Sequence, residues 1–255
     1  MGFLTEGPAS FGLSGERVTL SPTIKPNTRR APGRRVSPAD LDLFSHIEKN
    51  LYTAVISDAL DEIGFRDRAM REHLRPLAPD FVFAGWARTI TCVDVHYESE
   101  DPYGLEIEAL DSVLGGEVVV VGTGESKRNA PWGELLSTAA MARGARGAVV
   151  DGLTRDVKKI LALGFPVFAA GIKPVDSRGR GVVADYNVPV ECGGVVVSPG
   201  DLIVADYDGV VAIPVEAVTE TVRRATEKVS RENSTREELI QGAYLRDVYE
   251  KYGVL

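Results

Sequence analysis

The segment GAVVDGLTRDVKKILALGFPVFA, residues 147–169, contains the pattern that decides the fold. The apolar run at 147–150 is typical of a buried strand, the stretch 155–163 of a helix, and the run 166–169 of a second strand. This order of elements predicts a sheet with helical crossovers.

The hexapeptide DGLTRD, residues 151–156, lies where the first strand is expected to end and the helix to begin. An Asp-Gly pair is typical of a turn, and Thr154 is typical of a helix cap. Neither role explains an arginine beside a second aspartate. Arg155 and Asp156 are therefore candidates for chemistry.

The flanking sequence continues the mixed pattern on both sides. Helices are expected at 37–64, 103–114 and 133–143, from Pro214 onward, and at 236–250. Strands are expected at 81–93, at 117–122 and, as short runs, over 181–214. One short pair is a hairpin, because Asp208-Gly209 separates two apolar stretches. The class is therefore mixed α/β, with one domain over 37–255 after an irregular extension over 1–36.

Composition and charge narrow the range of partners. The 255 residues are 44% hydrophobic and 26% charged, which is ordinary for a globular protein. The net charge of -8 argues against nucleic acid as the main partner, because phosphate binding needs clustered Lys and Arg. A local arginine can still attract an anionic substrate. No targeting segment is visible and no stretch is long and apolar enough to cross a membrane, so we expect a cytoplasmic protein without a membrane partner.

Motifs of other enzyme classes are incomplete in this chain. GTGE at 122–125 follows a predicted strand, but Lys127 stands where a dinucleotide-binding loop would have its third glycine. The three histidines, His46, His73 and His96, lack the spacing of metal ligands. These patterns do not support a nucleotide-binding or histidine-based metal site.

Two predicted helix starts offer more specific chemistry. The first N–H groups of a helix are unpaired and carry partial positive charge, so each start can bind a carboxylate or a phosphate. Gly133 lets a ligand approach the backbone, where the amides of Leu135 and Leu136 are available. At the second start, Arg155 offers a planar fork for a carboxylate, and Asp156 offers an oxygen ligand for Mg²⁺. This combination suits a small 2-oxo acid.

Structural interpretations of the same residues stay open at this point. Asp151 can belong to a turn, and Thr154 can be only a helix cap. Glu134 and Asp156 can be first-turn acids that the helix dipole stabilises. Pattern and spacing alone do not decide between these roles and catalysis.

A longer stretch resembles a known family. WGELLSTAAMARGARGAVVDGLTRDVKKILALGFPVFA, residues 132–169, is similar to the segment shared by regulator of ribonuclease activity A and the 4-hydroxy-4-methyl-2-oxoglutarate aldolases. Three features match in order: Gly133-Glu134 before an Ala-rich helix, Asp151-Gly152-x-x-Arg155-Asp156, and a Phe-Pro-Val-Phe strand. TAVISDAL at 53–60 and GGVVVSPGDLIVADYDGVVAIP at 193–214 also resemble the family. The resemblance covers residues 50–230.

The resemblance implies an αββα sandwich of the swivelling-domain type, here with helical additions at both ends. It also implies trimers or paired trimers, with active sites between subunits. Arg155 corresponds to the catalytic arginine that binds the substrate, and Asp156 to the ligand of Mg²⁺ or Mn²⁺. Glu134, where many aldolases have Asp, corresponds to the acid that orders a metal-bound water. Beside Gly133, the amides of Leu135 and Leu136 correspond to the groups that hold the pyruvyl carboxylate.

The function that the resemblance implies is that of a metal-dependent, class II pyruvate aldolase. Such an enzyme cleaves a 4-hydroxy-2-oxo acid to pyruvate by a retro-aldol reaction, and oxaloacetate decarboxylation is expected as a second activity. The metal polarises the 2-oxo group, and Arg155 holds the developing negative charge. Family members also inhibit ribonuclease E by binding it, so a non-catalytic regulator is the alternative. The set of Arg155, Asp156 and Glu134 favours the enzyme.

Overall fold

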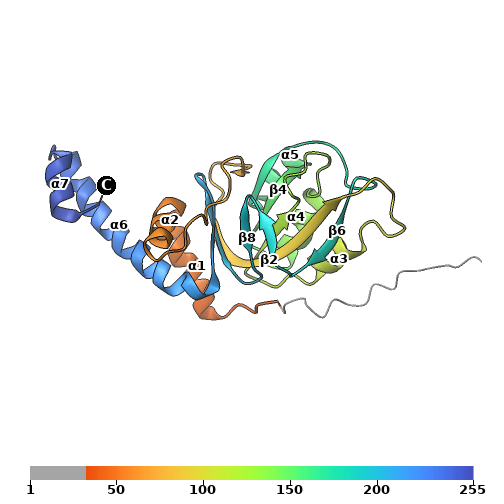
Figure 1. The fold of residues 1–255 in the computed structure, drawn as a ribbon, viewed down its shortest axis with the longest axis horizontal. Coiled ribbons are helices and arrows are strands. Elements are labelled where there is room, and N and C mark those ends of the chain that lie inside the picture. Colours follow the sequence, from red (N-terminus) through yellow and green to blue (C-terminus); the bar gives the residue numbers. More distant parts are fainter. Residues whose placement is uncertain (1–32, 255) are drawn as a thin grey trace, which may run out of the picture.

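The computed structural model describes residues 33–254, so the extension predicted over 1–36 lies mostly outside the described residues. Figure 1 shows a curved sheet with helices against it, and a C-terminal helical arm that projects away from the sheet. Within 33–254, no helix is both long and apolar enough to cross a membrane. The predicted mixed α/β class, with helices added at both ends, is confirmed.

An eight-stranded sheet forms the centre of the domain, in the order β1-β5-β4-β3-β2-β9-β10, with β6 also paired to β2. The strands are β1 Arg75–Pro76, β2 Phe83–Asp94, β3 Glu117–Gly122, β4 Gly147–Thr154, β5 Val167–Ile172, β6 Gly181–Tyr186, β9 Leu202–Asp206 and β10 Gly209–Ile213. Strands β2 to β5 run parallel, and the other pairs are antiparallel. The carboxyl ends of β3, β4 and β5 therefore meet at one edge, where open α/β sheets bind ligands.

Strand β2 is 12 residues long and belongs to two parts of the sheet. Its residues 83–86 pair with β9, and its residues 90–94 pair with β6. Along its other edge, residues 86–91 pair with β3. The register of the pairing with β6 shifts between Thr91 and Cys92. A long strand with two successive partners lets the sheet curl.

Three helices cover one face of the sheet, and a hairpin covers the other. The helices are α3 Gly104–Asp111, α4 Glu134–Ala142 and α5 Val157–Leu163, and the hairpin strands are β7 Val190–Cys192 and β8 Val195–Val197. In β3, Val119 and Val121 pack in the cluster that includes these helices, whereas Val118 and Val120 pack with the hairpin. Burial of both faces accounts for the run of four valines in β3.

The terminal helices differ from the predicted ones at their boundaries. They are α1 Pro38–Asn50, α2 Thr53–Glu62, α6 Val218–Ile240 and α7 Leu245–Tyr252. One helix over 37–64 was the wrong prediction, because Leu51 and Tyr52 have extended backbone between α1 and α2. A separate helix over 236–250 was also wrong, because α6 continues through Ile240. The helices α1, α2 and α6 share an apolar cluster with β9 and β10.

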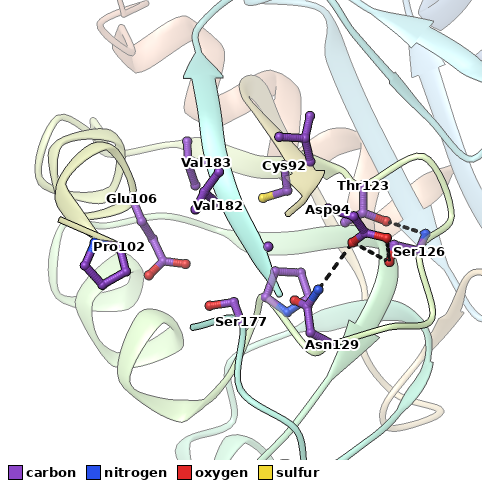
Figure 2. Close-up of a pocket in the computed structure, with 13 residues that line it drawn as sticks. Cys92, Asp94, Pro102, Glu106, Thr123, Ser126, Asn129, Ser177, Val182 and Val183 are labelled. Carbon is purple, nitrogen blue, oxygen red and sulfur yellow. Dashed lines mark hydrogen bonds between the residues drawn. The ribbon is translucent and has the colours of Figure 1, made fainter. Parts of the chain in front are cut away.

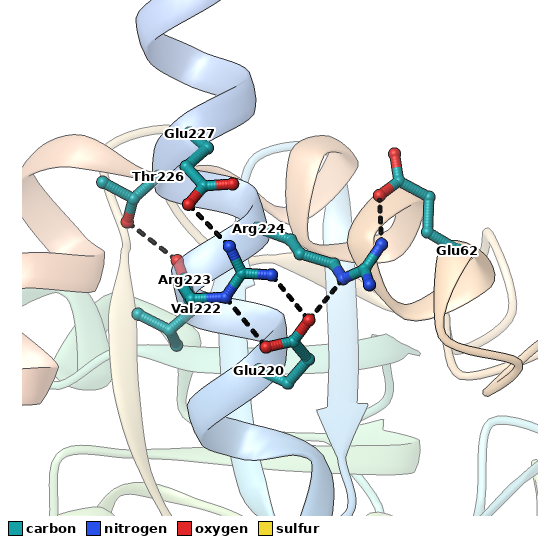
Figure 3. A network of polar contacts seen from close by, with 7 residues as sticks. All are labelled: Glu62, Glu220, Val222, Arg223, Arg224, Thr226 and Glu227. Carbon is teal, nitrogen blue, oxygen red and sulfur yellow. Dashed lines mark hydrogen bonds and ion pairs between the residues drawn. The ribbon is translucent and has the colours of Figure 1, made fainter.

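Ion pairs cover the exposed side of α6 (Figure 3). Arg223 pairs with Glu220 and Glu227 of the same helix. Arg224 pairs with Glu220 and, at 3.2 Å, with Glu62 of α2. Solvent screens such exposed pairs, so they contribute little to stability. The position of α6 on the domain therefore depends mainly on the apolar cluster.

Candidate active site

A cavity of about 330 Å³ lies where the two predicted helix starts meet. Its walls are α3, the start of α4, the connection between β4 and α5, and the loop after β5. The predicted residues that line it are Gly133, Leu135, Leu136, Arg155 and Asp156. The fold thus brings together two segments that are distant in the sequence.

Backbone contacts hold these two segments side by side. Trp132 forms a parallel bridge with Thr154, and its carbonyl accepts hydrogen bonds from the Arg155 N–H at 3.0 Å and the Thr154 hydroxyl at 3.2 Å. Leu153 and Thr154 also pair with Gly171 and Ile172 of β5, so β4 continues through Thr154. The predicted end of the strand at Val150 and the predicted turn after it are therefore wrong. Thr154 is a strand residue and not a helix cap.

Asp151 has a structural role beneath the site. Its carboxylate accepts hydrogen bonds from the backbone N–H of Thr123 at 2.5 Å and of Gly193 at 3.4 Å. Burial raises the pKa of this carboxyl although both hydrogen bonds oppose the shift. Asp151 thereby connects the end of β4 to the end of β3 and to the β7–β8 hairpin, and it is not among the cavity-lining residues.

Asp156 has a left-handed backbone conformation, with φ of 59°. For a residue with a Cβ this conformation costs roughly 1–2 kcal/mol, although aspartate adopts it more readily than most. Asp156 is the N-cap of α5 and not a first-turn residue, and its side chain does not cap that helix. Its Oδ2 instead lies 3.5 Å from the N–H of Glu134 at the start of α4. Backbone strain of this kind is concentrated at functional sites.

Arg155 lies between two carboxylates in the wall of the cavity. Its Nη2 is 3.2 Å from Oδ1 of Asp176, and its Nε is 3.7 Å from Oδ2 of Asp156. The Tyr103 hydroxyl donates a hydrogen bond to Oδ2 of Asp176 at 2.7 Å. Burial opposes ionisation of Asp176, but the Tyr103 hydrogen bond and the charge of Arg155 outweigh it and lower the pKa. Asp176 is therefore ionised at neutral pH and orients the guanidinium.

Glu106 of α3 is a third acid in this wall, and its side chain is half-buried. Burial raises its pKa to about 7, and the negative charge of Asp176 acts in the same direction, whereas Arg155 opposes both. A carboxyl group with this pKa is partly protonated at neutral pH. It can therefore both donate and accept a proton there.

Tyr103, Glu106 and Asp176 are site residues that the sequence patterns did not predict. Asp176 follows β5, which is a parallel neighbour of β4, and loops after parallel neighbours meet at one edge. Glu106 precedes the buried residues Ala109 and Leu110 by three and four positions, so it falls on the apolar stripe of α3. An acid on such a stripe is unusual, and this signal was present in the sequence.

Glu134 is placed differently from the other predicted residues. It begins α4, and its Oε1 accepts a hydrogen bond from the Thr138 hydroxyl at 3.0 Å. Its side chain thus follows its own helix, and the residue is not among those that line the cavity. The catalytic role of Glu134 stays a prediction.

A divalent ion at this site would depend mainly on Asp156. Among residues 33–254, no three His, Cys, Asp or Glu side chains are grouped to hold a metal. Mg²⁺ usually keeps several waters and binds through one or two carboxylates together with substrate oxygens. The Asp156 side chain is 43% exposed beside the cavity and fits this mode. The donor set does not fit a zinc site, which needs three or four protein ligands.

We expect Glu106→Gln to change how stability depends on pH. Folding raises the pKa of Glu106 from 4.5 to about 7, so the folded protein holds this proton more tightly than the unfolded chain. The resulting stabilisation is fully present below pH 4.5 and is lost as the pH rises to about 7. After allowance for partial exposure, the variant should therefore be more stable than the parent by about 2 kcal/mol at pH 8.

Urea unfolding at pH 8 and pH 5 measures this difference directly. Most of the advantage of the Gln variant should be gone at pH 5, because Glu106 is then protonated in the folded protein. An equal difference in unfolding free energy at both pH values would contradict the raised pKa.

Comparison with known proteins finds relatives along most of the chain. The model of the family RraA-like (Aldolase/RraA) matches residues 53–212. An uncharacterized protein of Methanocaldococcus jannaschii is 40% identical over 152 residues, which cover 59% of this chain and 72% of the relative. A Halalkalibacterium halodurans protein named "Putative 4-hydroxy-4-methyl-2-oxoglutarate aldolase" is 33% identical over 205 residues, which cover 80% of this chain and 91% of the relative.

A solved structure shows the same fold. It is that of a Streptomyces coelicolor protein described as an unusual member of the RraA family of RNase ES inhibitors. The TM-score is 0.70 at 30% identity, and the match covers 80% of this chain and 99% of that chain. The fold class predicted from the resemblance is therefore confirmed.

Proposed function

The chain belongs to the RraA-like family of aldolases and RraA proteins, and from this premise we propose that it is a metal-dependent lyase of the class II aldolase type. Its substrate would be a 4-hydroxy-2-oxo acid of the 4-hydroxy-4-methyl-2-oxoglutarate type, cleaved to pyruvate. One observation carries the proposal: Arg155, Asp156 and the start of α4 line one cavity.

The start of α4 is suited to the carboxylate of the pyruvyl half. The first N–H groups of a helix have no acceptor within it, and its positive end attracts an anion. Leu135 and Leu136 line the cavity at this point, and the N-cap Gly133 has no side chain to compete for their amides. A Cβ at Gly133 would lie 2.9 Å from Oδ2 of Asp156, so glycine keeps this approach open.

Arg155 is suited to the negative charge that develops on cleavage. When the bond between carbons 3 and 4 breaks, its electron pair becomes part of the enolate of pyruvate. The guanidinium of Arg155, held in place by Asp176, lies in the same cavity and would stabilise this charge without reorganisation. Mg²⁺ or Mn²⁺ bound at Asp156 would supply a Lewis acid for the 2-oxo group. Glu134 would take the hydroxyl proton through an ordered water, as the resemblance implies.

The same arrangement suits a second reaction. Loss of CO₂ from oxaloacetate also produces the enolate of pyruvate. Stabilisation by Arg155 would therefore support oxaloacetate decarboxylation in the same cavity.

An assay of pyruvate release tests the proposed function. The purified protein is supplied with a panel of 4-hydroxy-2-oxo acids and oxaloacetate, with Mg²⁺ or with excess chelator. We expect pyruvate with Mg²⁺ and none above background with chelator. Release of no pyruvate from any substrate would contradict the lyase.

The second candidate is a non-catalytic regulator of a ribonuclease. The Streptomyces coelicolor neighbour, described as a member of a ribonuclease-inhibitor family, favours it. Inhibition of a ribonuclease E-type enzyme by both the parent protein and Arg155→Lys, without pyruvate release, would support this candidate instead.

We expect the protein to assemble as a trimer or hexamer. Ile107 and Leu135 line the cavity, yet they are 56% and 75% exposed in a single copy. Burial of a large apolar side chain contributes about 1.5–3 kcal/mol, so a neighbouring copy would gain by covering them. Light scattering should give the mass of three or six chains, and Ile107→Glu should lower both the mass and pyruvate release. A monomer at working concentration would contradict the assembly.

A further inference from the structure

Glu106 lines the cavity described above and also a smaller cavity beside it. The smaller cavity has a volume of about 10 Å³, and its polar lining includes Asp94, Ser126, Asn129 and Ser177 (Figure 2). The Ser126 hydroxyl donates to Oδ1 of Asp94 at 2.8 Å, and the Asn129 amide donates to the same atom at 3.5 Å. This volume admits about one water with several polar partners. Glu106 thus lines both the substrate cavity and a smaller cavity that has polar groups in its wall.

The groups that face Glu106 come from several elements of the fold. They are Asp176 after β5, Arg155 before α5, Tyr103 at the start of α3 and Cys92 of β2. The hydrogen bond to Asp176 raises the pKa of Tyr103, and burial raises that of the Cys92 thiol, so both are neutral at pH 7. Arg155 and Asp176 are the charged neighbours, and they form an ion pair with each other.

The fold shifts the pKa values of Asp176 and Glu106 in opposite directions. That of Asp176 is lowered by Tyr103 and Arg155 against the effect of burial, and that of Glu106 is raised, chiefly by burial. Burial of Glu106 has a visible cause, because its side chain also borders an apolar cavity lined by Ile90 and Leu110. In a pair of carboxyl groups whose pKa values are separated in this way, the group with the higher pKa typically acts as the acid, and the other stays ionised.

We propose that Glu106 is the catalytic acid that delivers a proton to carbon 3 of the pyruvate enolate, a role that rests on the proposed function. In the retro-aldol reaction, the 4-hydroxyl loses its proton, and the bond between carbons 3 and 4 breaks to give the enolate. The protonated Glu106 then donates to carbon 3, which forms the methyl group of pyruvate and leaves Glu106 as a carboxylate. Water returns a proton to Glu106, and the proton lost from the hydroxyl balances it.

The decarboxylation of oxaloacetate ends in the same step. CO₂ leaves, Glu106 donates its proton to carbon 3, and water supplies the replacement. One proton is consumed for each CO₂ that is released. The smaller cavity beside Glu106, with polar groups in its wall, would hold the water that renews this proton.

The other acids of the cavity are engaged differently. Among the described residues, three acids line it: Glu106, Asp156 and Asp176. Asp176 is ionised, forms an ion pair with Arg155 and accepts a hydrogen bond from Tyr103. Asp156 is the proposed metal ligand. Glu106 is the acid that carries an exchangeable proton at neutral pH.

Exchange of the methyl hydrogens of pyruvate, which is the reverse of the proposed protonation of carbon 3, tests the role of Glu106. An enzyme that protonates carbon 3 also removes a proton from pyruvate, so the methyl group should exchange hydrogen for deuterium in D₂O with Mg²⁺ present. Proton magnetic resonance of the methyl signal measures the rate. Glu106→Gln should slow this exchange by about a hundredfold, the lower end of what general acid–base groups contribute. It should also remove the inflection near pH 7 from the pH profile of the parent.

Glu108→Gln is the matched control. Glu108 lies on the same helix outside the cavity, and its carboxylate accepts a hydrogen bond from Tyr186, which glutamine can also accept. This variant should exchange pyruvate at the rate of the parent. A parent protein that neither releases pyruvate nor exchanges its methyl hydrogens would overturn the proposed function itself. Pyruvate release by the parent, with unchanged exchange and pH profile in Glu106→Gln, would overturn the role of Glu106 alone.

Discussion

Alanine in place of Asp156 should lower pyruvate release by about a thousandfold or more, because it would remove the proposed ligand of a metal ion whose Lewis acidity would supply several kcal/mol. Asp176 cannot replace Asp156 as a ligand, since its carboxylate forms an ion pair with Arg155 and accepts a hydrogen bond from Tyr103. Binding of Mn²⁺, measured by titration calorimetry, should weaken together with kcat/KM.

Asp156→Asn separates the loss of charge from the loss of the backbone conformation. At a φ of 59°, alanine is strained, whereas asparagine adopts the left-handed region about as readily as aspartate. The asparagine variant should therefore keep the melting temperature of the parent and still lose Mn²⁺ binding and activity. Full activity of the parent in excess chelator would remove the metal from the mechanism.

Arg155→Lys should lower the rate of pyruvate release by about a hundredfold or more, the usual scale for losing one preorganised donor. Lysine keeps the charge but loses the planar fork, so the change is not conservative at a carboxylate site. It also loses the geometry of the pair with Asp176, at 3.2 Å in the parent. The melting temperature should change little, because this pair is partly exposed and solvent screens it. Steady-state kinetics and thermal unfolding check the two expectations separately.

Lys158→Ala is a suitable control for this substitution. Lys158 lies in the first turn of α5, is exposed, and is not among the cavity-lining residues. Lys158→Ala removes a positive charge close to the cavity but should leave turnover intact. If Arg155→Lys kept normal turnover on the best substrate, Arg155 would not act in catalysis, and the ribonuclease regulator would become the favoured function. A large fall in stability would instead indicate a structural role beside Asp176.

The fold could be predicted from the sequence where a pattern is local and unambiguous. The four valines of β3 and the Asp208-Gly209 turn between β9 and β10 gave elements that the structure confirms. The break at Leu51 and Tyr52 was missed, because the apolar stripe continues across it and no Gly or Pro marks it. The end of β4 was misjudged because its last residues pair with β5 and Thr154 also pairs with Trp132, and no local propensity encodes such tertiary contacts.

The site shows the same division. Arg155, Asp156 and Gly133 were identified because their motifs are specific, and the structure places them in one cavity. Glu106 and Asp176 are single acids on a helix and in a loop, without a motif around them. The position of Glu106 on the apolar stripe of α3 is a sequence signal, but its raised pKa and the pairing of Asp176 with Arg155 depend on the assembled fold.

The long strand β2 has a consequence for how the domain folds. Its two ends pair with β9 and β6, and β3 runs along its other edge, so neither half of the sheet can separate without breaking pairs of the other half. The sheet should therefore unfold in one cooperative transition. Pairing of residue 83 with residue 205 also gives the domain many non-local contacts, which slow folding. The first half of α6 packs in the apolar cluster with β9 and β10, whereas its far end and α7 project away from the sheet. The amide hydrogens of this projecting part can therefore exchange through local opening while the sheet stays intact.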